Sequence, residues 1–100
     1  MAVIIRWSDE AKKTFDDNID YLLAKWSEKE IINFIKQTNF KLSNLASNPK
    51  IYKQSEKKRG VRKTNINKSI SLFFKYFPTK KEVVLLSFWN NRQDPKKLKY

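Results

Sequence analysis

The two most apolar stretches of the sequence lie next to each other, at 70–77 (ISLFFKYF) and 83–89 (VVLLSFW). Both are rich in the β-branched and aromatic residues that favour strands. The connector between them contains Pro78, which presets the φ of a turn, and two lysines that tolerate exposure. We therefore predict a β-hairpin with a loop of four or five residues. Because apolar side chains fall on both faces of 70–77, we expect these strands in the middle of a sheet, with each face at least partly covered.

The first half of the chain predicts one short strand and two helices. Segment 2–7 (AVIIRW) is apolar and too short for a helix. Ser8 can cap a helix over 9–25, and Ser27 with Glu30 forms a capping-box pattern before a second helix over 28–46. With almost no linker, the helices must form an antiparallel hairpin. Its apolar stripes share one side and contain Ala11, Phe15, Ile19, Leu22, Leu23, Trp26, Ile31, Ile32, Ile35, Thr38, Leu42, Leu45 and Ala46. We expect that side to pack on the sheet, the alternative being an interaction surface.

The rest of the chain completes the sheet. We expect a polar loop over 47–58 that Ile51 and Tyr52 attach to the body, then Gly60 and an edge strand over 61–66 that begins at Val61. Residues 90–100 have no periodic pattern, and we expect order there only where they touch the body or a partner. The prediction is a single domain, 1–100, with an α+β fold: an N-terminal strand and an antiparallel helical hairpin packed on an antiparallel β-sheet meander.

The positive charge is concentrated in the sheet half. The net charge is +12, with eight Lys and Arg against seven Asp and Glu in residues 1–50, and fourteen against three in residues 51–100. A field of this sign attracts nucleic acid, an acidic protein or an anionic membrane. A solvated basic surface without a dedicated ligand is the alternative.

Residue types that are missing exclude several functions. The sequence has no cysteine and no histidine, so thiolate metal sites and Ser-His or Cys-His catalysis are excluded. It has no P-loop, HExxH or Gly-rich nucleotide motif. We expect neither a metal nor a cofactor. Acidic residues follow the N-terminal apolar run too soon for a signal peptide, so we expect a cytoplasmic protein without membrane association.

The candidate site residues are cations interleaved with aromatic residues. They are Lys57, Lys58, Arg59, Arg62, Lys63 and Arg92, together with Tyr52 and Trp89. Guanidinium forks bind phosphate and aromatic faces stack on unpaired bases, so this set is suited to single-stranded RNA. Metal-free RNA cleavage further needs a base, an acid and cations around the phosphate. A lysine of the 57–58 pair or Glu56 is the candidate base, and solvated surface charge is the alternative for each.

Two arginines are expected to act together. We predict that the meander brings Arg62 and Arg92 to one side of a groove, where they neutralise a phosphate. The alternative is that one of them pairs with Asp94 or Glu82 and anchors the C-terminal residues.

The order and spacing of several short motifs resemble the RelE/ParE toxin superfamily of bacterial type II toxin-antitoxin systems. They are Trp7-Ser8 with Ala11, the helical hairpin closed by Leu45 and Pro49, Gly60-Val61-Arg62, Leu72-Phe73-Phe74-Lys75-Tyr76, and Asn90-Asn91-Arg92. The resemblance covers nearly the whole chain. It implies a small cytoplasmic toxin that a cognate antitoxin wraps and silences.

The same resemblance implies one of two targets: mRNA on the ribosome, cut by a metal-independent endoribonuclease, or DNA gyrase. In the nuclease branch, Lys57, Lys58, Arg62 and Arg92 match the catalytic cations, with Arg59, Lys63, Tyr52 and Trp89 left to bind RNA or a partner. Trp89-Asn90 stands where many relatives carry histidine, and Tyr100 is the last residue. The long helical hairpin resembles the gyrase branch. A non-toxic nucleic-acid- or protein-binding module of the same fold is the alternative to both.

Overall fold

The hairpin predicted over 70–89 forms the centre of a four-stranded sheet in the computed structural model, which describes residues 3–100. Its strands are β3 (Ile70–Phe77) and β4 (Glu82–Asn90), and Lys81 in the turn has a φ of 51°. The sheet order is β1-β4-β3-β2, with β1 at Ile4–Trp7 and β2 at Arg62–Asn65. The antiparallel meander is confirmed for β2, β3 and β4, but β1 joins β4 in parallel, so the sheet is mixed. Ala2, expected in the first strand, lies outside the described residues.

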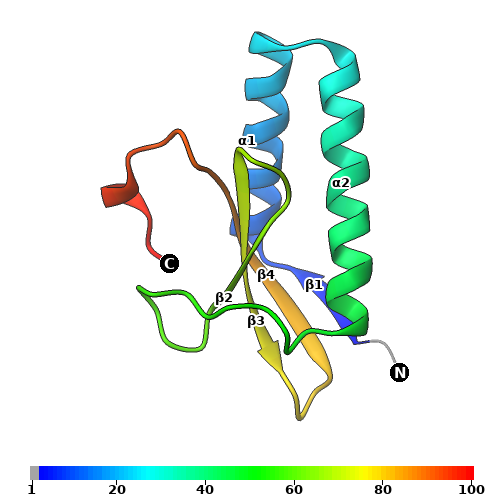
Figure 1. Cartoon of the computed structure of the whole chain (residues 1–100), viewed down its shortest axis with the longest axis vertical. Coiled ribbons are helices and arrows are strands. Elements are labelled where there is room, and N and C mark those ends of the chain that lie inside the picture. Colours follow the sequence, from blue (N-terminus) through cyan, green and yellow to red (C-terminus); the bar gives the residue numbers. More distant parts are fainter. Residues whose placement is uncertain (1–2) are drawn as a thin grey trace.

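The two helices lie side by side along one face of the sheet (Figure 1). They are α1 (Asp9–Lys25) and α2 (Glu28–Ser47). At the start of α1, the Ser8 hydroxyl accepts a hydrogen bond from the N–H of Ala11 at 3.0 Å, as predicted. The capping box at Ser27 is wrong, because the Ser27 side chain makes no cap hydrogen bond and its carbonyl accepts from the N–H of Glu30 instead.

The core lies between the helices and the sheet. Its fully buried members include Leu72 and Phe74 of β3, Leu85 of β4, and Phe34 and Leu45 of α2. Phe15 of α1 joins the layers, with ring centroids 5.3 Å from Trp7, 5.1 Å from Phe34 and 5.2 Å from Phe88. Such offset and edge-on aromatic contacts add to the burial energy and fix how α1 sits on the sheet.

The far end of the helical hairpin differs from the prediction. Four members of the predicted stripe are substantially exposed: Leu23 (62%), Trp26 (50%), Ile32 (45%) and Ile35 (40%). The helices contain 17 and 20 residues, whereas the strands contain four to nine. At 1.5 Å per residue the helices span about 25 and 30 Å, so their joined ends extend past the sheet (Figure 1). The expectation that the whole stripe packs on the sheet is therefore wrong at this end.

The loop before β2 forms backbone hydrogen bonds with residues in and next to that strand. Lys63 N–H donates to the carbonyl of Lys53 at 2.9 Å, and Ser55 N–H donates to that of Val61 at 2.7 Å. The predicted edge strand is confirmed, because β2 is the outermost strand of the sheet. It begins at Arg62, one residue later than expected, since Val61 is fully buried and precedes it, and the loop leaves its outer edge less exposed than expected. Tyr52 anchors the loop by packing edge-on against Phe74, with ring centroids 5.7 Å apart. Ile51 does not anchor it, because its side chain is 74% exposed.

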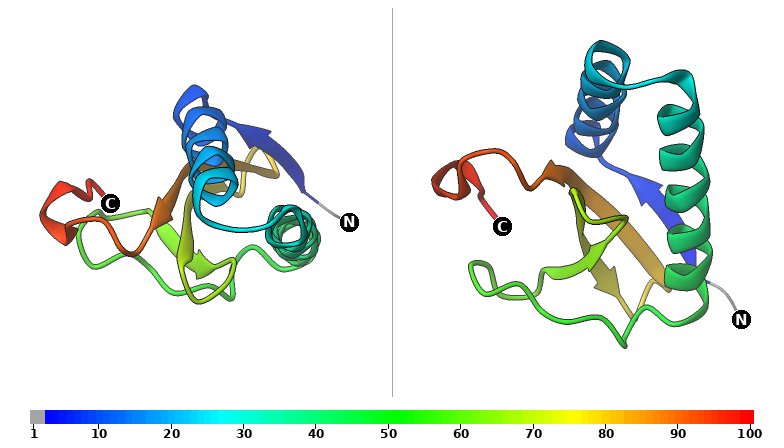
Figure 2. Two further views of the ribbon diagram at one scale, coloured as in Figure 1. Left: turned by 90° about the horizontal axis from the view of Figure 1, so that it is seen from above. Right: turned by 45° about the horizontal axis from the view of Figure 1, so that its top comes forward.

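The C-terminal segment, defined here as residues 91–100, turns back toward the sheet on the side away from α2 (Figure 2). It contains a short 3-10 turn at Pro95–Lys97, which the Asp94 side chain caps by accepting from the N–H of Lys96. Between residues 3 and 100, neither helix has the length and apolar character needed to cross a bilayer.

Candidate functional site

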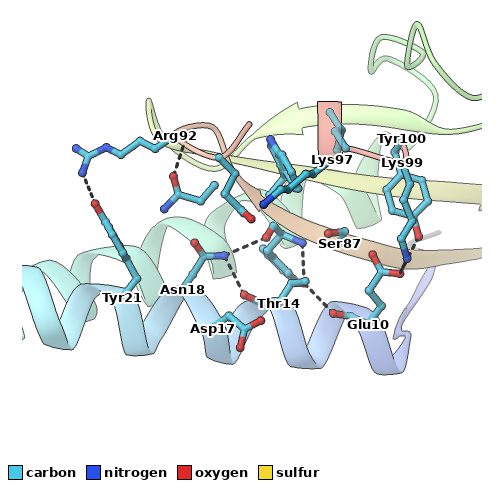
Figure 3. Close-up of a pocket in the computed structure, with 15 residues that line it drawn as sticks. Glu10, Thr14, Asp17, Asn18, Tyr21, Ser87, Arg92, Lys97, Lys99 and Tyr100 are labelled. Atoms are coloured by element: carbon cyan, nitrogen blue, oxygen red, sulfur yellow. Dashed lines mark hydrogen bonds and ion pairs between the residues drawn. The ribbon is translucent and has the colours of Figure 1, made fainter. Parts of the chain in front are cut away.

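The outer edge of β4 is closed by polar side chains of α1 (Figure 3). β1 ends at Trp7, which pairs with Leu85, so beyond that point β4 has a strand partner only on its β3 side. Thr14 Oγ1 accepts from the N–H of Phe88 at 2.9 Å, and Asn18 Nδ2 donates to the carbonyl of Phe88 at 3.0 Å. These two bonds satisfy backbone groups that β1 does not reach. They hold α1 against the strand and form one wall of the site.

The open face, as we call the side of the sheet opposite the helices, carries Ser71, Phe73, Ser87 and Trp89. The register places them together, because Phe73 pairs with Ser87 and Ser71 pairs with Trp89. Phe73 is only 2% exposed although no helix lies over it. Tyr100 covers it instead, with the rings stacked at 5.8 Å and 30°. The C-terminal segment is thus ordered by contact with the body, one of the two outcomes expected from the sequence.

Tyr100 is hydrogen-bonded to two other parts of the chain, α1 and the loop before β2. Its hydroxyl donates to Glu10 Oε1 at 3.1 Å, and the same oxygen accepts from Lys99 Nζ at 3.1 Å. The Ser55 hydroxyl donates to the carbonyl of Tyr100. Burial raises the pKa of the Tyr100 phenol, and the hydrogen bond to Glu10 and the charge of Glu10 raise it further. The phenol is therefore neutral at physiological pH and serves as a hydrogen-bond donor.

Three of the predicted cations lie near the Tyr100 and Phe73 rings or the chain that carries Tyr100. Lys57 Nζ donates to the carbonyls of Pro95 at 2.8 Å and Leu98 at 3.0 Å. Lys58 Nζ lies 5.4 Å from the centre of the Tyr100 ring, and Lys63 Nζ lies 5.9 Å from that of Phe73. Both distances are within the range of cation–π attraction. We call Lys57, Lys58 and Lys63 the lysine cluster.

The structure keeps the two predicted arginines apart. The Arg62 guanidinium donates to the carbonyls of Lys50 at 3.2 Å and Tyr52 at 2.7 Å, so it anchors the preceding loop. The Arg92 guanidinium donates to the Tyr21 hydroxyl on α1 and lies over that ring at 5.8 Å.

The strand register shows how far apart the arginines lie. Arg62 pairs with Phe74, whereas Ile70 pairs with Asn90, two residues before Arg92. The four-residue step along β3 from Phe74 to Ile70 spans about 13 Å. A shared phosphate site for Arg62 and Arg92 is therefore wrong for this arrangement, as is pairing of either one with Glu82 or Asp94. Glu82 pairs with Arg6 at 3.4 Å instead.

The remaining predicted residues fall into separate places. Trp89 lies on the open face beside Ser87, whereas Tyr52 packs against Phe74 on the helix side of the sheet, so the two do not form one stacking platform. Burial raises the pKa of Tyr52. Arg59 and Glu56 are exposed in the turn that ends at Gly60, whose φ of +83° favours glycine. Within residues 3–100, no three Asp or Glu side chains gather where they would hold a metal ion.

Several residues of this site were missed from the sequence. Thr14 and Asn18 interrupt the apolar stripe of α1 at i, i+4 spacing, and this interruption was the available signal for a polar contact with a strand edge. Glu10 and Ser55 gave no signal, because a helix-start acid and a loop serine are common surface residues. Only the fold brings them to Tyr100.

The C-terminal segment divides the open face into two hollows. One, of about 460 Å³, lies between α1, β4 and the segment, and it is lined by Asn18, Ser87 and Trp89 among others. The second, of about 410 Å³, lies between the segment, the 53–57 loop and β2, and it is lined by Lys57, Lys63 and Phe73 among others. Leu98 and Tyr100 line both hollows. The arrangement combines cations and aromatic faces with the C-terminal segment that covers them.

Known proteins share this sequence pattern and this architecture. A family model described as the ParE toxin of the type II toxin-antitoxin system parDE matches residues 5–95. Among curated proteins, none matches the sequence significantly.

Solved structures with the same fold include several toxins. The chromosomal ParDE toxin-antitoxin system of P. aeruginosa superposes with a TM-score of 0.73 and 17% identity, covering 89% of this chain and 96% of that chain. The isolated E. coli RelE toxin superposes with a TM-score of 0.65 and 15% identity, covering 95% of this chain and 90% of that chain. A chain of the Mycobacterium tuberculosis RelBE2 toxin-antitoxin complex superposes with a TM-score of 0.63 and 13% identity, covering 90% of this chain and 99% of that chain. At these identities the likeness concerns the fold.

Proposed function

The chain belongs to the ParE toxin family of type II toxin-antitoxin systems, and we propose that it inhibits growth by binding DNA gyrase. The observation that carries this target is the family match over residues 5–95, which includes the complete helical hairpin. A long hairpin of this kind is the feature by which the sequence resembles the gyrase-directed branch of the superfamily. In this proposal the toxin acts by binding, and no bond is made or broken by its own side chains.

The dispersion of the candidate catalytic cations supports the proposal. Cleavage at a 2′-hydroxyl needs a base, an acid and cations at one phosphate. Here Arg62 is bound to loop carbonyls, Arg92 lies on Tyr21, and Lys57 is bound to carbonyls of the C-terminal segment. These three groups are engaged at three separate places, which favours a binding function over catalysis.

A second candidate, mRNA cleavage on the ribosome, is favoured by a different observation. The lysine cluster and Tyr100 lie together on the open face, where they combine cations with a phenol and an aromatic stack. An RNA strand entering there would meet cations and stacking surfaces. This candidate requires the C-terminal segment or the 53–58 loop to move, because the Lys57 ammonium already donates to the carbonyls of Pro95 and Leu98.

We also propose a cognate antitoxin as the neutralising partner. The solved relatives with this fold include ParDE and RelBE toxin-antitoxin complexes. The +11 charge of residues 51–100 favours an acidic or amphipathic partner. Tight binding to the product of the neighbouring gene, measured at low and high salt, tests this partner.

A pulse of expression separates the two targets. Protein synthesis, mRNA integrity and the DNA-damage response are followed in parallel, and purified protein is added to a gyrase supercoiling reaction. We expect an early damage response, intact mRNA and inhibited supercoiling. Early translational arrest with cut mRNA, together with normal gyrase activity, would replace this proposal with the nuclease. Phe74→Ala, which disrupts the core, provides the inactive control.

A further inference from the structure

The C-terminal segment covers the open face by a small set of polar contacts at its far end. These contacts are the Tyr100 hydroxyl to Glu10, the Lys99 ammonium to Glu10, the Ser55 hydroxyl to the Tyr100 carbonyl, and Lys57 to two carbonyls. Residues 91–97 are all exposed. The far end of the segment is therefore fastened by groups that water replaces readily, unlike the helices, which the core holds.

The surface under this end has the character of a site. Tyr100 lies against the Phe73 ring on one side, and the Lys58 ammonium approaches it at 5.4 Å. Phe73 is a buried aromatic ring whose neighbours on this face include the small residues Ser71 and Ser87 and a second aromatic ring, Trp89. A space lined by an aromatic ring and ammonium groups fits a flat ring that carries negative charge nearby.

The two hollows beside the segment show what its removal would produce. Leu98 and Tyr100 are shared between their linings, so these side chains form the partition between them. With the partition lifted, the surface runs from Trp89 across Phe73 to Lys57 and Lys63. Such a groove combines two aromatic stacking positions with a line of cations, the arrangement that binds single-stranded nucleic acid.

We propose that residues 91–100 form an autoinhibitory strap that closes a groove for single-stranded nucleic acid. In the closed state, Tyr100 occupies the position on Phe73 that an unpaired base takes in the open state. The carbonyls of Pro95 and Leu98 occupy Lys57, which in the open state binds a phosphate. Glu10 is the latch, because one of its oxygens accepts from both Lys99 and Tyr100. The strap covers the face that RNA would enter in the second candidate function, so the inference rests on that candidate and not on gyrase binding.

The chain's lack of cysteine allows a direct measurement of strap opening. Ser87 is 3% exposed and lies on the open face opposite Phe73 in the register, so Ser87→Cys introduces a single thiol under the strap. The rate at which this thiol reacts with a soluble disulfide reagent reports access to the open face. Binding is measured in parallel, without the reporter, from the anisotropy of a labelled oligothymidylate of about ten nucleotides.

Two variants release the latch and one serves as a matched control. Glu10→Ala removes the acceptor of both bonds, and Tyr100→Phe removes one bond while keeping the stack. Asp16→Ala removes an equal charge from an exposed position on the same helix. For Glu10→Ala we expect thiol labelling and oligothymidylate affinity to rise about fivefold, the scale of a lost charge-assisted hydrogen bond discounted for partial exposure. Tyr100→Phe should shift both in the same direction by less, and Asp16→Ala should leave labelling unchanged.

Three results would overturn the proposal. Unchanged thiol labelling in Glu10→Ala would show that Glu10 is not a latch. Faster labelling with weaker oligothymidylate binding would make the segment part of the binding surface instead of its cover. An equal gain for a decaglutamate peptide, which has the charge but no rings, would show that the opened face does not select nucleic acid. Circular dichroism and thermal melting of each variant confirm that the fold is retained.

Discussion

The two faces of the sheet are closed by different means. On the helix side, Phe74, Leu85 and Phe34 interlock in a continuous apolar layer, and each is at most 1% exposed. On the open face, Phe73 is buried to a similar degree, but its ring is covered by Tyr100 at the end of an exposed segment, with the Lys63 ammonium 5.9 Å from the ring centre. Side chains that are equally buried on the two faces therefore contribute differently to the free energy of unfolding. Truncating a side chain costs the most stability where the surrounding residues cannot move into the resulting cavity.

The sharpest test of this difference compares adjacent phenylalanines. Phe74→Ala should lower the free energy of unfolding by about 3–5 kcal/mol, because rigid helices and strands surround the resulting cavity. Phe73→Ala should cost less than half of this, because Tyr100 can settle onto the sheet. Chemical denaturation measures both, with exposed Lys80→Ala as the near-silent control. Equal losses at 73 and 74 would contradict the comparison.

The next largest loss of stability should come from breaking the polar contact between α1 and β4. Asn18→Ala leaves the buried carbonyl of Phe88 without its partner, so we expect a loss of about 1–3 kcal/mol in unfolding free energy. Asn18 is 4% exposed, which leaves little room for water to compensate. Asp17→Ala, one position away and exposed, is the control. A melting temperature equal to that of the unchanged protein would show that the strand edge finds another donor.

Alanine substitution of the two arginines should separate an effect on stability from an effect on toxicity. Arg62→Ala frees the carbonyls of Lys50 and Tyr52 and should destabilise the protein by about 1–2 kcal/mol, because the anchored loop loses its guanidinium. Arg92→Ala at an exposed position should leave the melting temperature nearly unchanged. A growth assay run beside the melts then assigns Arg92. Reduced toxicity with intact stability would place it at the target surface, and full toxicity would remove it from the site.

The smallest expected effect concerns the phenol of Tyr100. Its pKa is raised by burial and by Glu10, so its stabilising bond is complete below the ordinary tyrosine pKa and is lost as the pH rises through the higher folded value. Tyrosinate absorbance during alkaline titration should contain a late step that Tyr100→Phe removes. Tyr52, whose pKa burial also raises, supplies the comparison through Tyr52→Phe. No change in the late step of Tyr100→Phe would contradict the contact with Glu10.

The sequence by itself determined the elements and their order. Hydrophobic periodicity located β3 and α1 at the bounds that the structure has, and β4 and α2 within one residue at the ends that differ. These elements follow from local spacing and caps, which neighbouring residues set. The resemblance to RelE/ParE toxins was likewise carried by short motifs in order, and the family match bears it out.

Only the tertiary structure decided which side chains meet. Because β1 ends opposite Leu85, the last part of β4 has no strand on its β1 side, and Thr14 and Asn18 bind its backbone there. The length of the helices relative to the strands exposed Trp26 and Ile32. The return of the C-terminal segment brought Tyr100 to Glu10 across ninety positions of sequence. Contacts at such separations depend on strand order, register and relative lengths, which no local pattern of residues encodes.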